Sequence, residues 1–261
     1  MVLGFRKRAS RHRLVSGQAH LARAAQMAAD GQHLILAPTH VRRYKAKYWT
    51  PPIPIISSIP GNNDAYPLIS MLKGQGLAFR YVVRSDCDVP GDFPMGRHIY
   101  RIGTRMVQLT QGMLFDNPIS LYLDQDYNPE GVATSIRNLY REAKATLASQ
   151  SLLIYPFGNW FLPGEDCFNP EIVMAEGGSE FIAPTNRKAY HDSVKRGAAQ
   201  LAIFNKVPIL PIYGTFKDKS WRFAVGELIE TAKRDPVDVT HDWLRAQSEM
   251  KQIIWKECHL E

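Results

Sequence analysis

Apolar residues in this chain alternate between short continuous runs and longer stretches with helical spacing. The short runs are bounded by Gly, Pro or charged residues, which is typical of strands buried on both faces of a parallel sheet. We predict such strands at His33–Ala37, Pro54–Ile59, Leu77–Val83, Ile119–Leu123, Ser151–Tyr155, Val207–Tyr213 and Trp221–Glu227.

The stretches between these runs repeat apolar residues every three or four positions, which indicates amphipathic helices. We predict helices at Val15–Ala29, after Asp64, and at Gly131–Ser149, Ser193–Phe204 and Val239–Lys256. A strand, a helix and another strand in succession predict a parallel crossover. The fold class is therefore α/β, with a central, mostly parallel sheet flanked by helices on both faces.

Length and charge narrow the class of partner. The 261 residues suffice for one large domain, and we expect a basic amino-terminal segment at 1–14 and a single α/β domain at 15–258. The net charge of +7 favours anionic partners such as phosphorylated metabolites, acidic lipid headgroups or nucleic acid. Five Arg or Lys residues and no acidic residue occur in the first thirteen positions, so we expect this end to contact anionic membranes.

Cysteine content and hydropathy bear on the compartment. The three cysteines are far apart and lack C-x-x-C spacing, which argues against a disulfide framework or a zinc ribbon. No apolar run is long enough to span a membrane, and no apolar segment follows the basic residues as in a signal peptide. We expect a cytoplasmic protein that is peripheral on the inner face of the membrane.

Several segments carry a resemblance to a known family. SVKRGAAQLAIFNKVPILPIYG (Ser193–Gly214), SLLIYPFGNW (Ser151–Trp160) and GQHLILAPTH (Gly31–His40) resemble the phospholipid/glycerol acyltransferases, typified by 1-acylglycerol-3-phosphate acyltransferase. Tyr155, Pro156 and Gly158 match the family's F-P-E-G-T-R motif. Phe157, Asn159 and Trp160 stand where Glu, Thr and Arg are expected, so the catalytic motifs are degenerate.

The resemblance implies transfer of a fatty acyl group from acyl-CoA or acyl carrier protein to a hydroxyl of a lysophospholipid-like acceptor. In the family's H-x-x-x-x-D motif, His is the general base and Asp orients its imidazole. Here His40 begins such a motif, but Lys45 occupies the Asp position. No metal or bound cofactor is implied.

Two alignments of this motif are open. In the first, Val41–Asn63 is an insertion and Asp64 returns beside His40. In the second, Pro54–Ile59 is the motif strand, and Ile59 takes the place of His, which means an inactive site. We favour His40 and Asp64 as the catalytic pair, although a loop histidine and a helix N-cap would also explain these residues.

The family binds the acceptor phosphate through an Arg after its middle strand. Gln125 or Asp126 replaces that Arg here, so another cation must compensate. The candidates are Arg84, Arg101, Arg105 and Lys195. Gly158 either forms a tight turn or lets backbone N–H groups approach an anion, and Asn159 can donate a hydrogen bond in both cases.

The predicted substrate-binding residues are Tyr155, Pro156, Gly158, Asn159, Lys195, Arg84 and Arg101. The alternative function is a catalytically silent acyltransferase-like domain that binds a lipid, an acyl carrier or a partner protein, which the residues at Lys45, Gln125, Phe157 and Trp160 favour. The patch RRYKAKYW (Arg42–Trp49) alternates basic and aromatic residues as single-strand binders do. No nucleic-acid fold motif accompanies it, so nucleic acid is not an expected partner.

Overall fold

The structure, a computed structural model, describes residues 12–39, 65–86, 95–123, 125–156, 196–217 and 220–260. Strands and helices alternate along these residues. Their order is β1 (His12–Ser16), α2 (Gln18–Ala29), β2 (Ile35–Pro38), α4 (Ala65–Gly74), β3 (Phe79–Arg84), α5 (Gly96–Leu114), β4 (Ile119–Leu121), α6 (Pro129–Thr146), β5 (Ser151–Leu153), α9 (Gly197–Asn205), β6 (Ile209–Lys217), β7 (Ser220–Val225) and α10 (Pro236–Leu260).

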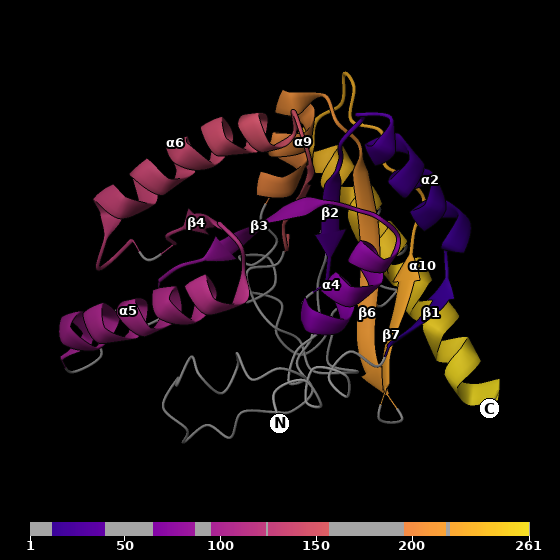
Figure 1. The fold of residues 1–261 in the computed structure, drawn as a ribbon, viewed down its shortest axis with the longest axis horizontal. Coiled ribbons are helices and arrows are strands. Elements are labelled where there is room, and N and C mark those ends of the chain that lie inside the picture. Colours follow the sequence, from indigo (N-terminus) through magenta and orange to yellow (C-terminus); the bar gives the residue numbers. More distant parts are fainter. Residues whose placement is uncertain are drawn as a thin grey trace.

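Within the described residues, seven strands form one sheet in the order β1-β7-β6-β2-β5-β3-β4. Strands β6, β2, β5, β3 and β4 run parallel to one another. Strand β7 is antiparallel to β6, and β1 is parallel to β7. In Figure 1, β2 and β6 run down the view and β7 runs up it. The twist of the sheet turns β3 and β4 so that they run sideways in the same view. The predicted α/β class and mostly parallel sheet are confirmed.

Helices cover both faces of the sheet. Successive residues of the central strands enter two separate cores, as Ile35 and Leu36 of β2 do. The core that contains Ile35 packs against α6, α9 and α10. The core that contains Leu36 packs against α2 and α4. This layering explains the continuous apolar runs, because both sides of each central strand are buried.

The amino-terminal elements differ from the prediction. Residues 12–16 form β1, paired with β7, and the helix begins only at Gln18. Gly17 separates them with φ of 84°, a left-handed conformation that interrupts a helix. The expected boundary at residue 14 therefore falls inside β1, and residues 1–11 lie outside the described residues.

One long helix was not among the predicted elements, and one predicted strand is not described. In the sequence, the α5 helix comes between β3 and β4. In space, it lies on the side of these strands away from α6 (Figure 1). The predicted strand Pro54–Ile59 lies outside the described residues. No helix in the described parts of the chain is both long and apolar enough to cross a membrane.

Candidate active site at the carboxyl edge of the sheet

Three neighbouring strands leave the sheet at the same level. Leu36 of β2 pairs with Leu153 of β5, and Leu153 pairs with Tyr81 of β3. Three residues further along each chain stand Thr39, Pro156 and Arg84. In open α/β sheets, ligands bind beyond the carboxyl ends of the strands. This edge is therefore the candidate site, and Pro156 and Arg84 are both among the predicted substrate-binding residues.

Thr39, the residue before His40, is held firmly beside β6. Its backbone N–H donates to Ile212 O at 2.9 Å, and its Oγ1 accepts a hydrogen bond from Gly214 N at 3.0 Å. The side chain is buried, and the preceding carbonyl of Ala37 accepts a hydrogen bond from Trp243 Nε1 at 2.8 Å. The chain therefore reaches His40 from a fixed point at the carboxyl end of β2, although His40 itself lies outside the described residues.

The start of α4 lies at the same edge. This helix joins β2 to β3, and both strands run in the same direction through their shared neighbour β5. It therefore runs back along the sheet and begins at the carboxyl edge. Ala65, Leu68 and Leu72 are buried, so the first turn is anchored in the core around Leu36. Asp64 directly precedes this turn and lies outside the described residues, so its pairing with His40 stays a prediction.

The end of β5 contributes the predicted residues Tyr155 and Pro156. Tyr155 packs against the same core as α4, and Pro156 is buried. Both follow a strand that lies between β2 and β3, so they are central in the candidate site. Gly158 and Asn159, the next predicted residues of this segment, lie outside the described residues.

Arg84 is engaged in an ion pair. Its Nε donates to Asp86 Oδ1 at 2.7 Å, and the Asp86 side chain is fully buried. Asp86 Oδ2 also accepts a hydrogen bond from the backbone N–H of Leu123 at 2.8 Å, which ties the end of β3 to the chain after β4. The carboxylate offsets the arginine charge, so an anionic ligand at Arg84 would compete with Asp86 for the guanidinium.

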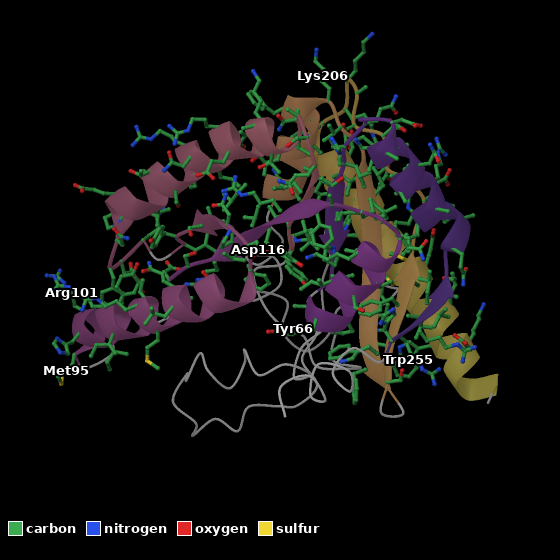
Figure 2. The ribbon with its side chains drawn as sticks, in the orientation of Figure 1. Tyr66, Met95, Arg101, Asp116, Lys206 and Trp255 are labelled. Carbon is green, nitrogen blue, oxygen red and sulfur yellow. The ribbon has the colours of Figure 1, made fainter. Side chains whose placement is uncertain are left out.

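The remaining predicted cations lie elsewhere or outside the described residues. Arg101 is exposed on α5, and Figure 2 shows it beside Met95 at the end of that helix remote from Tyr66 of α4. Arg101 lines a surface hollow of about 380 Å³ with Met95, Gly96, Arg97 and His98. Lys195 lies outside the described residues. Its neighbour Arg196 directly precedes α9, which leads into β6 and so also begins at the carboxyl edge.

Tyr81 is a buried residue of this region that the sequence pattern does not single out. Its ring packs against Phe79 and Phe115, with centroids 5.2 and 4.6 Å away. Burial, followed by the nearby charges of Asp116 and Tyr66, raises the pKa of the Tyr81 hydroxyl above its ordinary value. This hydroxyl has no hydrogen-bond partner among the described residues. Alternation along β3 predicts that the residue is buried, but local pattern contains no signal for an unpartnered hydroxyl.

The described residues contain no group of three or more His, Cys, Asp or Glu side chains arranged to hold a metal ion. The polar groups at this edge are instead suited to hydrogen bonding and charge pairing: they are the Thr39 hydroxyl, the Tyr155 hydroxyl and the Arg84–Asp86 ion pair.

Comparison with solved structures finds the 1-acyl-sn-glycerophosphate (LPA) acyltransferase PlsC from Thermotoga maritima. The two chains are 8% identical with a TM-score of 0.34, and the match covers 90% of this chain and 79% of that chain. No family, activity or residue role of the present chain is assigned from this similarity. Comparison with models of protein families and with curated proteins gives no match.

Proposed function

We propose that this protein transfers a fatty acyl group from an acyl thioester, acyl-CoA or acyl carrier protein, to a hydroxyl of a lysophospholipid-like acceptor. One observation carries the proposal: Thr39 and Ala65, the immediate neighbours of His40 and Asp64, are both buried at the carboxyl edge of the sheet. The Tyr155–Pro156 segment, which resembles the family's phosphate-binding motif, ends the strand adjacent to β2.

In the proposed reaction, His40 accepts the proton of the acceptor hydroxyl as its oxygen attacks the thioester carbonyl carbon. Asp64 holds the imidazole in the tautomer that can accept this proton and stabilises the imidazolium that forms. The tetrahedral intermediate then collapses, the C–S bond breaks, and the imidazolium returns the proton to the thiolate. The products are an ester and a free thiol, so no oxidant or reductant is needed.

The anionic end of the substrate would be bound by Gly158, Asn159 and Lys195, with Tyr155 and Pro156 shaping the adjacent wall. Arg84 would take part only if the anion displaced Asp86 from its guanidinium. Arg101, exposed at the end of α5 remote from Tyr66 of α4, is not included in this anion site. Peripheral contact with an anionic membrane on the cytoplasmic side would supply the acceptor, because lysophospholipids reside in the bilayer.

A thiol-release assay with acyl-CoA or acyl carrier protein and a panel of lysophospholipids tests this function. His40→Ala should lower turnover by roughly 10²–10⁴-fold, the typical contribution of a general base. His33→Ala is the matched control, because His33 comes two residues before β2 begins and so lies at the amino edge of the sheet. Circular dichroism of both variants separates loss of the base from unfolding.

The pairing of His40 with Asp64 is tested by a double-mutant cycle. If Asp64 orients the base, Asp64→Asn should reduce turnover, and the double variant should be no worse than His40→Ala alone, since residues that act as a unit are not additive. Independent, additive effects would separate Asp64 from the base. Equal turnover by wild type and His40→Ala would place the base elsewhere.

A silent acyltransferase-like domain is the second candidate. Two observations favour it: the family's Arg and Glu positions hold other residues, and Arg84 at the carboxyl edge is paired with a buried carboxylate. Such a domain would bind acyl chains or an acyl carrier and show no acceptor-dependent thiol release. Binding without release across the panel would therefore favour the silent domain over the enzyme.

A further inference from the structure

The α5 helix carries an apolar stripe on the side that faces away from β3 and β4. Met95, which directly precedes the helix, Ile102 and Leu109 are seven residues apart, so they lie on one face. Their exposed fractions are 74%, 54% and 68%, which are high for large apolar side chains. At 1.5 Å per residue the stripe is about 21 Å long.

The opposite side of α5 is fixed to the fold. Tyr100 is buried and stacks on Tyr127, with ring centroids 5.4 Å apart. Ser85 Oγ donates to Gln111 Oε1 at 2.9 Å, and Gln108 Nε2 donates to Tyr122 Oη at 2.8 Å. These contacts are spread along the helix, so they determine its rotation and keep the stripe outward.

A row of arginines borders the stripe. Arg97, Arg101 and Arg105 follow one another at intervals of four residues and are exposed, and α5 contains no Asp or Glu. With 3.6 residues per turn, this row converges on the stripe along the helix, so Arg105 lies beside Ile102 and Leu109 whereas Arg97 lies furthest from the stripe. The charge of the row is not offset within the helix. Arg97, Arg101 and His98 also line the hollow at the first turn of α5.

We propose that this face of α5, the stripe with its arginine row, is the surface through which the protein binds an anionic phospholipid bilayer. A helix with large apolar side chains on one side and basic residues beside them is suited to lie in the bilayer interface. The apolar side chains enter the acyl boundary, and the arginines reach the lipid phosphates. An acidic protein surface would match the arginines but would leave the stripe against polar groups.

The inference rests on the membrane contact in the proposed function but not on acyl transfer, and it holds equally for a silent domain. Vesicle binding and thiol release from a water-soluble, short-chain acceptor are separate measurements. A protein that releases thiol but does not bind vesicles would refute the membrane-binding role of α5. A protein that binds vesicles but releases no thiol would refute the acyltransferase activity.

Cosedimentation with phosphatidylcholine vesicles, with and without phosphatidylglycerol, tests the surface on the full chain. Wild type should bind the anionic vesicles, and high salt should weaken this binding. Ile102→Asp with Leu109→Asp should lower the partition coefficient by at least about tenfold, because the stripe no longer inserts. Ile136→Asp on α6, another exposed isoleucine on a helix, is the control and should bind as wild type does.

The charge contribution is tested by Arg97→Gln with Arg105→Gln. This pair should lower the partition coefficient roughly tenfold to thirtyfold at low salt and much less at high salt. Arg137→Gln with Arg141→Gln removes two exposed arginines from α6 and is the matched control. Thermal unfolding monitored by circular dichroism should show that all of these variants are folded.

Amide hydrogen exchange locates the contact independently of the variants. Anionic vesicles should slow exchange in residues 96–114 and leave residues 129–146 unchanged. Three results would overturn the inference: vesicle binding that the α5 variants leave intact, binding of acidic carrier protein but not of vesicles, or self-association that Ile102→Asp abolishes without any vesicle binding. The last would make the stripe an interface between copies of this chain.

Discussion

Two buried polar residues, Thr39 and Asp86, fix the chain where strands leave the sheet. Thr39 ties the end of β2 to β6 through one donated and one accepted hydrogen bond. Asp86 ties the end of β3 to the chain after β4 and pairs with Arg84. Buried polar groups are costly unless they are hydrogen-bonded, so these contacts hold the edge in one conformation.

Replacing Asp86 should be far more costly than replacing a surface aspartate. Asp86→Ala removes a fully buried carboxylate that accepts two short hydrogen bonds, and it should lower the free energy of unfolding by about 1–3 kcal/mol. Asp242→Ala, whose carboxylate is one-third exposed and pairs with Arg234, should lower it by less than about 1 kcal/mol. Denaturant titration measures both, and equal losses would show that the Asp86 contacts do not clamp β3 to β4.

Tyr81 should make stability depend on alkaline pH. Its pKa is raised in the folded protein, so above pH 10.0, the ordinary value, the unfolded chain loses this proton first and stability falls. Tyr81→Phe removes this dependence and also removes a buried hydroxyl without a partner among the described residues. The variant should be about 1 kcal/mol more stable near neutral pH and should gain further on wild type above pH 10.

Unfolding free energies of wild type and Tyr81→Phe, measured from neutral to alkaline pH, check this expectation. Parallel curves above pH 10 would mean that the Tyr81 hydroxyl titrates as freely in the folded protein as in the unfolded chain.

At the scale of elements, the turn between β1 and α2 depends on close packing against β7. Gly17 has a positive φ, and a Cβ there would lie 1.9 Å from the carbonyl oxygen of Val225. The absence of a side chain lets the turn approach the end of β7 while β1 pairs with that strand. A contact between residues so far apart in the sequence explains why local periodicity placed the helix start too early.

Two glycines with nearly the same φ separate backbone strain from this contact. Gly31→Ala imposes a left-handed alanine with no atom within 4 Å of the new Cβ and should cost about 1 kcal/mol. Gly17→Ala adds the overlap with Val225 and should cost at least about 2 kcal/mol more. Thermal or denaturant unfolding compares the two, and similar losses would refute the role of the close approach.

At the scale of the whole molecule, basic charge occurs both on α5 and in the amino-terminal segment. Arg13, the last of the five basic residues in the first thirteen, lies in β1 and pairs with Glu257 at 2.7 Å. Removing residues 1–13 would therefore damage the sheet, whereas removing residues 1–11 leaves β1 intact.

Deletion of residues 1–11 removes four basic residues and should weaken binding to anionic vesicles at low salt, because each contributes about 1 kcal/mol near such a surface. If the segment and α5 contribute independently, this loss should add to that of Ile102→Asp with Leu109→Asp. Equal cosedimentation by the full and shortened chains would remove this segment from the membrane contact. Binding that depends on the segment alone would contradict the role of α5.

The sequence alone determined the α/β class, most of the element order and the burial of the central strands, because these follow from local periodicity and from burial on both faces of the sheet. It also directed attention to the segments that end β2 and β5. Tertiary structure decided that β5 separates β2 from β3, that β1 joins β7, that Asp86 engages Arg84, and that the apolar stripe of α5 faces outward. These features depend on pairings between residues far apart in the chain. Such pairings are selected by the packing free energy of the whole sheet, which no local pattern encodes.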